Sequence, residues 1–135
     1  MLKKMPQVRE FMTKAPLTIG EETPLGAVID VFRKLDIRHV PVTQGKKLVG
    51  VLSERNVRAA LVSGAGGERF QARDAMSPDP YVTEASTPLD EVAARMAEDK
   101  YGCAIIEEDG NVVGIFTTVD ACRALRHVLA ALFAS

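Results

Sequence analysis

Two short polar segments, each directly after an apolar run, hold the side chains best suited to chemistry. They are Thr117, Thr118 and Asp120 in one segment and Ser53, Arg55 and Asn56 in the other. A hydroxyl at a helix N-terminus lies beside free backbone N–H groups and the positive end of the helix dipole, which together suit a phosphate. The structural alternative makes Thr117 only a helix N-cap and Asp120 only a first-turn acid.

The remaining reactive side chains give little support for catalysis. Neither Cys103 nor Cys122 has an adjacent base, so both are expected to behave as small buried apolar residues. His39 and His127 are far apart in the sequence, which gives a metal site little support. Nucleophile-elbow, P-loop and zinc-protease motifs do not occur, and the glycine-rich residues 64–67 do not follow a strand as a dinucleotide fingerprint would.

The composition is that of an ordinary globular domain. The chain has 135 residues, of which 47% are hydrophobic and 26% charged, and this argues against disorder. A net charge of −1 leaves no basic surface for nucleic acid. The apolar runs are too short for a membrane span, and the N-terminus does not read as a signal peptide. A cytoplasmic protein is therefore the default expectation.

An internal repeat organises the chain. Shifting the sequence by 64 positions aligns residues 8–61 with residues 72–125 without a gap and gives 11 identities in 54 positions. The identities cluster at residues that fix backbone geometry, such as Pro16 with Pro80 and Gly50 with Gly114. We therefore expect two copies of one unit, at 1–63 and 72–135, joined by a linker at 64–71.

Both copies have the same predicted order of elements, β-α-β-β-α, which is an α/β (α+β) fold. A short strand comes first, near 17–19 and 81–83. The first helices follow predicted threonine N-caps and a proline, at Thr23 and Thr87. Each helix ends about ten residues on, near Asp36 and Lys100. Two β-rich runs joined by a glycine turn come next. They are 39–43 and 47–52 in the first copy, and 103–107 and 112–116 in the second copy. The second helices, 54–62 and 119–133, begin after Ser53 and after Thr117 or Thr118.

The size of the repeat predicts that its copies associate. A unit of about 60 residues buries only about 60% of its unfolded surface and is marginal alone. The copies should therefore pack against each other about a pseudo-twofold axis, and the cleft between them is a natural ligand site.

Each half resembles a CBS motif, and the tandem resembles a CBS pair, or Bateman module. The resemblance is carried by Met12-Thr13 and Met76-Ser77, by Thr-Pro-Leu at both first helices, and by residues 38–42, 50–56 and 114–120. It covers residues 6 to 126. It implies an adenosine-type ligand in the clefts between motifs: AMP, ADP or ATP first, with NAD or S-adenosylmethionine as further options, and no required cofactor. It also implies that two chains pair into a four-motif disk.

The resemblance assigns ligand contacts to the second half. Asp120 would accept hydrogen bonds from the ribose diol, as the acidic residue of dinucleotide folds does. Thr117 and Thr118 would lie beside the phosphates.

The first half departs from this pattern. Ser53 fits, but Asn56 replaces the aspartate and offers one acceptor oxygen and no charge. Arg55 is either a charge-assisted phosphate donor or a solvated surface arginine.

The resemblance also implicates the residues that begin the hairpins and the first strands. Arg38 and His39 would face the phosphates, whereas their counterparts Gly102 and Cys103 carry no charge. A hydrogen-bonded histidine at a strand edge is the alternative for His39. The loops expected to line the adenine pocket contain Pro16, Leu17, Pro80 and Tyr81, although turn and strand-entry roles explain both prolines equally well.

The last helix carries an apolar stripe that must be buried somewhere. Its residues are Ala121, Leu125, Val128, Leu129, Leu132 and Phe133. The partner is its own domain, a second copy or a client protein, and we favour a homodimer. The function expected is a non-enzymatic sensor of adenine nucleotides that signals to an unknown client. The alternative is a dimerisation scaffold with degenerate clefts, which Asn56 favours.

Overall fold

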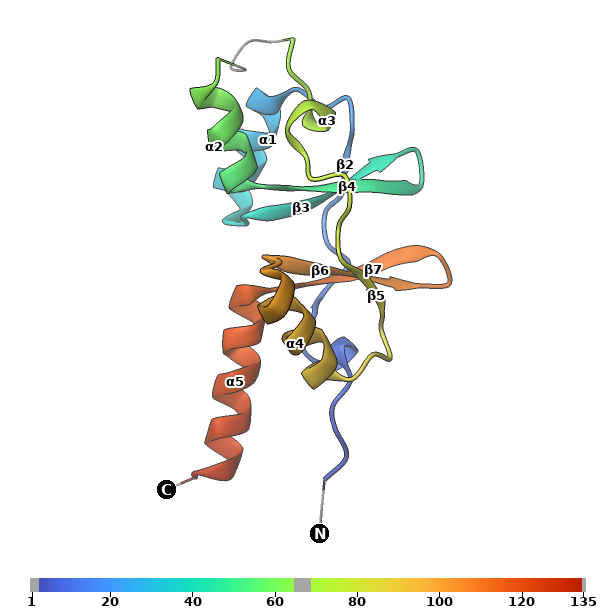
Figure 1. Ribbon diagram of the computed structural model, residues 1–135, viewed down its shortest axis with the longest axis vertical. Helices are drawn as coiled ribbons and strands as arrows, with labels where there is room; N and C mark the ends of the chain where they lie inside the picture. Colours follow the sequence, from blue (N-terminus) through green and yellow to red (C-terminus); the bar gives the residue numbers. More distant parts are fainter. Residues whose placement is uncertain (1–2, 65–68, 135) are drawn as a thin grey trace. The chain divides into compact units, whose positions relative to one another are not determined.

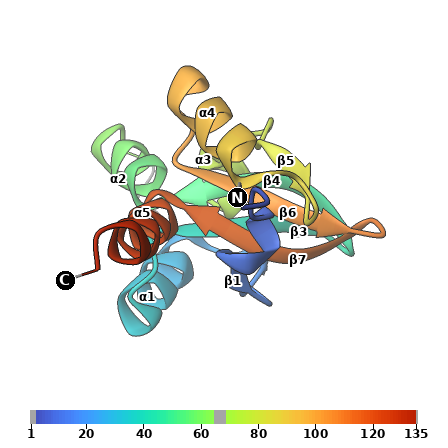
Figure 2. The same cartoon turned by 90° about the horizontal axis from the view of Figure 1, so that it is seen from below.

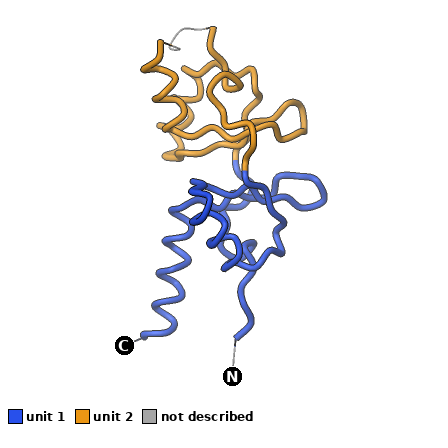
Figure 3. Tube along the Cα trace, in the orientation of Figure 1, with its two compact units in different colours: residues 1–16, 81–135 blue, residues 17–80 orange. Residues whose placement is uncertain are grey.

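The structure, a computed structural model, describes residues 3–64 and 69–134. Two compact units are present: unit 1 lies within residues 1–16 and 81–135, and unit 2 within residues 17–80 (Figure 3). The expected linker at 64–71 falls partly outside the described residues, at 65–68. None of the helices in the described part of the chain is long and apolar enough to cross a membrane.

Unit 2 is built on a three-stranded sheet with the strand order β2-β3-β4. Its elements are β2 (Ile19–Gly20), α1 (Leu25–Leu35), β3 (His39–Gln44), β4 (Lys47–Ser53), α2 (Glu54–Val62) and α3 (Ala72–Ala75). Strands β2 and β3 are parallel, whereas β3 and β4 form an antiparallel hairpin. Helices α1 and α2 lie on one face of this sheet (Figure 1).

Unit 1 has a four-stranded sheet with the order β1-β7-β6-β5. Its elements are the 3-10 helix η1 (Val8–Glu10), β1 (Thr13–Lys14), β5 (Val82–Glu84), α4 (Leu89–Asp99), β6 (Cys103–Glu108), β7 (Asn111–Thr117) and α5 (Thr118–Leu132). Strands β5 and β6 are parallel, and β7 pairs antiparallel with both β6 and β1. Figures 1 and 2 place α4 and α5 on one face of this sheet. The expected β-α-β-β-α order and mixed α/β class are confirmed in both units.

The segment that leads into each repeat packs on the sheet of the other repeat. Val8, near the start of the chain, is fully buried in the core of unit 1, where its backbone N–H donates to Thr87 over 2.9 Å. Ala72, its counterpart 64 positions on, is fully buried in unit 2, where its N–H donates to Thr23 over 2.8 Å. The compact units therefore differ from the sequence division at 1–63 and 72–135, because backbone pairing and burial assign these segments to the other repeat.

The predicted N-caps Thr23 and Thr87 are wrong. The helices begin at Leu25 and Leu89 after proline N-caps, with no side-chain capping bond. The first N–H groups are satisfied instead by carbonyls of the leading segments: Leu25 N–H donates to Phe70 over 3.0 Å, and Leu89 N–H donates to Pro6 over 2.8 Å. The predicted helix ends are confirmed, since Asp36 and Lys100 are left-handed C-caps with φ of 51° and 58°.

Two glycines allow the leading segments to approach the hairpins. A Cβ on Gly50 would lie 2.6 Å from the Met76 sulfur and 2.7 Å from the Ser77 carbonyl oxygen. A Cβ on Gly114 would likewise overlap the Met12 side chain. The Met–Gly identities found at an offset of 64 therefore mark one contact made in each unit.

Candidate functional site

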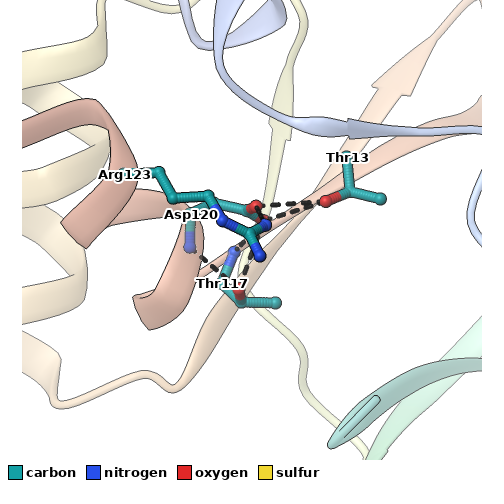
Figure 4. Close-up of polar contacts among 4 residues, drawn as sticks. All are labelled: Thr13, Thr117, Asp120 and Arg123. Atoms are coloured by element: carbon teal, nitrogen blue, oxygen red, sulfur yellow. Dashed lines mark hydrogen bonds and ion pairs between the residues drawn. The ribbon is translucent and has the colours of Figure 1, made fainter. Parts of the chain in front are cut away.

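The polar cluster of unit 1 surrounds the N-terminus of α5 (Figure 4). Thr117 is the N-cap, and its hydroxyl accepts from the Asp120 backbone N–H over 3.2 Å. In return, the Asp120 carboxylate accepts from the Thr117 backbone N–H over 2.9 Å and from its hydroxyl over 3.2 Å. This reciprocal pair is a capping box, which satisfies two N–H groups that a helix start would otherwise leave free.

The same carboxylate reaches two further elements. The Thr13 hydroxyl, on β1, donates to the two Asp120 oxygens over 3.1 and 3.2 Å. The Arg123 guanidinium, one turn along α5, lies 3.6 Å from Asp120 Oδ1. Only 4% of Asp120 is exposed, and it is the one charged side chain buried among the described residues. Both carboxylate oxygens are therefore engaged within unit 1, and any external donor would have to replace one of these contacts.

Unit 2 has the same capping box, but an uncharged asparagine takes the place of the aspartate. The Asn56 backbone N–H donates to the Ser53 hydroxyl, and the Ser53 backbone N–H donates to Asn56 Oδ1, both over 3.0 Å. Asn56 is partly exposed. The position equivalent to Thr13 is Ser77, which exchanges two backbone hydrogen bonds with Val51, over 2.9 and 3.1 Å. Thr13 pairs in the same antiparallel way with Ile115 in unit 1, so both units share this backbone pairing and unit 1 adds the bond from the Thr13 hydroxyl to Asp120.

Basic residues gather at the start of α2. Strand β3 begins at His39 opposite Ser53, so Arg38 and His39 lie beside the N-terminus of α2. Glu54 pairs with Arg58 and lies 3.8 Å from Arg38. Arg55 is exposed, and 75% of the Arg38 side chain is exposed. Cationic groups at a helix N-terminus add to the dipole, and this arrangement attracts anions.

His39 and its counterpart Cys103 are both buried enough to shift their titration. Burial, and then the positive charge of Arg38, lower the pKa of His39 below 6.5. Burial raises the pKa of the Cys103 thiol to about 12. Cys103 is therefore an inert core residue, as expected. The same expectation is wrong for Cys122, which is exposed on α5.

The residues expected at an adenine pocket are divided between the units. Pro16 and Tyr81 belong to unit 1, whereas Leu17 and Pro80 belong to unit 2. Tyr81 is 9% exposed and packs in the unit 1 core.

Tyr81 also takes part in an aromatic cluster. Its ring stacks on Tyr101 with 5.4 Å between centroids, and the Arg95 guanidinium lies 5.1 Å from the Tyr81 ring centroid. Leu17, by contrast, is 46% exposed. Val40 and Ile105 are fully buried.

Sequence reasoning missed two partners of Asp120. Arg123 follows Asp120 by three positions on a helix, a spacing that places side chains on one face and was a usable signal. Thr13 lies 107 positions away, and its only signal was membership in the repeated Met-Thr/Ser pair. Pairing of β1 with β7, in which Thr13 lies opposite Ile115, brings it to the cluster.

Comparison with known proteins identifies the family. The CBS domain profile matches residues 8–63 and 72–127. The chain therefore belongs to the CBS domain family and contains two copies of the domain.

Several relatives share this arrangement. The crystal structure of a protein assigned to acetoin utilization (AcuB) from Vibrio cholerae is 29% identical, covers 98% of both chains and has a TM-score of 0.86. CBSX2, solved in complex with AMP, is 26% identical, with 90% of this chain and 97% of that chain covered and a TM-score of 0.77.

Curated relatives are matched over part of their length. Human H(+)/Cl(−) exchange transporter 3 is 31% identical over 51 residues, which is 38% of this chain and 6% of the transporter. The uncharacterized protein MJ0188 of Methanocaldococcus jannaschii is 24% identical over 119 residues, which is 87% of this chain and 43% of that protein.

Proposed function

We propose that this CBS pair is a regulatory module that binds an adenosine-type ligand and signals through the geometry of a dimer or partner protein, without catalysing a reaction. The observation that carries the proposal is membership in the CBS family over both repeats, together with the likeness to CBSX2, which binds AMP. AMP, ADP and ATP are the first candidates, and NAD and S-adenosylmethionine are the next. The homodimer, the client protein and the cytoplasmic location belong to the same proposal.

The helix N-termini of α2 and α5 are the proposed ligand contacts. At α2, Arg38 and Arg55 supply positive charge beside Ser53 and Asn56, which suits phosphates, and His39 offers a neutral imidazole as a hydrogen-bonding group. At α5, the Asp120 carboxylate would accept from a ribose diol, with Thr117 and Thr118 beside it. The Pro16–Leu17 and Pro80–Tyr81 pairs are the proposed adenine contacts.

One observation favours the alternative of a scaffold that binds no nucleotide. The Asp120 oxygens already accept from Thr13 and Thr117 and lie near Arg123. A ribose diol would have to displace a donor from a carboxylate that is 4% exposed. The sensor and the scaffold therefore differ at Asp120. In the sensor a bound ribose replaces one of its hydrogen-bond donors, whereas in the scaffold all of these donors stay in place.

The experiment is a thermal-shift panel with AMP, ADP, ATP, NAD and S-adenosylmethionine, followed by calorimetry. A ligand at 100 times its dissociation constant should stabilise the fold by about 2.7 kcal/mol. Asp120→Asn is the informative variant, because unit 2 shows that asparagine preserves the capping box. A charge-assisted hydrogen bond contributes about 1.5–3 kcal/mol, so binding should weaken roughly 10- to 100-fold.

A ligand without the diol completes the design. 2′,3′-Dideoxy-AMP should bind the wild-type protein more weakly than AMP does, and this difference should become smaller in Asp120→Asn, because asparagine keeps one acceptor oxygen but no charge. Arg38→Ala should weaken binding of phosphorylated ligands but not of adenosine, and Arg33→Ala, an exposed arginine on α1, is the matched control. No shift with any nucleotide would instead support the scaffold.

A further inference from the structure

The partners of the Asp120 carboxylate come from two separate elements of unit 1. Thr117 donates through its backbone N–H over 2.9 Å and through its hydroxyl over 3.2 Å, and the Arg123 guanidinium lies 3.6 Å away. Both of these residues belong to the start of α5. The Thr13 hydroxyl comes instead from β1, 107 positions away in the sequence (Figure 4). Loss of the Thr13 bond therefore leaves the helix cap intact.

The Thr13 bond is long for a hydroxyl that faces a carboxylate. Its oxygen lies 3.1 Å from one Asp120 oxygen and 3.2 Å from the other. Charge-assisted O–H···O⁻ bonds are shorter, at about 2.5–2.7 Å. The two long distances arise because one hydroxyl proton is shared between two acceptors. A ribose diol has two hydroxyls and can donate one proton to each oxygen, so it satisfies this carboxylate better than Thr13 does.

Strand β1 is also held weakly. It consists of two exposed residues, Thr13 and Lys14, and lies at the edge of the sheet beside β7. The next residue, Ala15, has a φ of 46°, in the left-handed region that is unfavourable for a residue with a Cβ. Its counterpart in unit 2, Asp79, does not have a positive φ. Release of β1 would relieve this strain, which makes displacement of Thr13 less costly.

We propose that Thr13 sets the affinity of unit 1 for a ribose diol: its hydroxyl competes with the ligand for Asp120, and a bound ligand frees β1 from this carboxylate. This role of Thr13 rests on the proposed function, because it requires a nucleoside at Asp120. It adds a residue that the ligand displaces rather than contacts. It also gives binding a structural consequence, which is the loss of order at residues 13–15.

The first test measures AMP binding to the full chain by calorimetry. Valine has the shape of threonine without the hydroxyl, so Thr13→Val should bind AMP about 2- to 10-fold more tightly than wild type, the change that corresponds to one hydrogen bond. Thr13→Ser is the matched control, because it keeps the hydroxyl, and it should bind as wild type does. 2′,3′-Dideoxy-AMP has no diol to displace Thr13, so it should bind wild type and Thr13→Val equally.

The second test measures the order of β1 by amide hydrogen exchange, followed residue by residue by NMR. The Ala15 N–H donates to the Val113 carbonyl over 3.0 Å. Saturating AMP should remove the protection of this amide, whereas 2′,3′-dideoxy-AMP should not. Thr13→Val should lower the same protection without any ligand. The Val8 amide is the control: this residue is fully buried, its N–H donates to Thr87 over 2.9 Å, and its protection should stay unchanged.

The outcomes separate the role of Thr13 from the proposed function. If Thr13→Val binds AMP as wild type does or more weakly, Thr13 does not compete with the ligand, and its proposed role is overturned while nucleotide binding stands. If AMP binds and the Ala15 amide keeps its protection, the release of β1 is overturned. If no nucleotide binds either protein, the sensor and the role of Thr13 are overturned together. Binding to Thr13→Val alone would support the competition.

Discussion

The capping boxes of the two units have the same backbone geometry and opposite electrostatic character. In unit 1 the Asp120 charge is turned inward, where Thr13, Thr117 and Arg123 compensate it within one fold. In unit 2 the uncharged Asn56 closes the same box, and the charges, Arg38 and Arg55 among them, lie outside it on the surface. A duplicated unit can thus keep its helix start while one copy uses the polar cap for internal cohesion and the other leaves its charge available to solvent.

The largest difference expected between the units is the response of their hairpin glycines. A Cβ on Gly50 would lie 2.7 Å from the Ser77 carbonyl, a backbone atom that cannot rotate away, whereas the three atoms nearest to a Cβ on Gly114 all belong to the flexible Met12 side chain. Gly50→Ala should therefore lower the free energy of unfolding by about 3 kcal/mol and Gly114→Ala by about 1 kcal/mol, measured by urea denaturation.

Gly26→Ala controls for the added methyl group. Nothing lies within 4 Å of a Cβ at Gly26, which is exposed on α1, so alanine should raise stability by about 0.5 kcal/mol. Equal losses at Gly50 and Gly114 would show that the approach of the leading segments is equally adaptable in both units.

Removing the side-chain cap should also destabilise the two units unequally, but by a smaller difference than the glycine substitutions. Asn56→Ala removes one cap and should cost about 1 kcal/mol. Asp120→Ala also leaves the Thr13 hydroxyl without its acceptor and should cost about 2 kcal/mol. Denaturant titration of the two variants checks the difference, and an Asn56→Ala loss as large as that of Asp120→Ala would remove the distinction between the caps.

The smallest expected effect is a change of folding stability with pH that arises from His39 in unit 2. The pKa of His39 in the folded protein lies below its unfolded value of 6.5, because burial and Arg38 disfavour the imidazolium. The unfolded chain therefore binds the proton more tightly, and stability should fall as the pH drops below about 6.5. His39→Gln should flatten this part of the stability profile, measured by thermal melts between pH 5 and 8, whereas an unchanged profile would assign the titration to another group.

Local sequence signals predicted most of the secondary structure. The glycine turns, the hydroxyl-bearing caps Ser53 and Thr117, and the helix ends near Asp36 and Lys100 were all predictable, because each depends on residues within one turn of chain. The predicted caps Thr23 and Thr87 failed because their helices receive carbonyls from Phe70 and Pro6, far away in sequence.

The candidate site was predicted in its residue types and only partly in its contacts. Asp120 was singled out by its spacing from Thr117, and that pair is present. Its burial and its bond to Thr13 depend on β1 joining the edge of β7, which no local pattern encodes.

The sequence by itself determined the duplication, the order of elements in each copy, the CBS family and the divergence of Asp120 from Asn56. Periodicity, turn residues and capping hydroxyls carry this information because they act between near neighbours. Tertiary structure alone decided which repeat each leading segment packs on, how the Asp120 charge is compensated, and that one face of α5 stays exposed. Those outcomes depend on hydrogen bonds and burial between residues up to about a hundred positions apart, and only the folded chain brings them together.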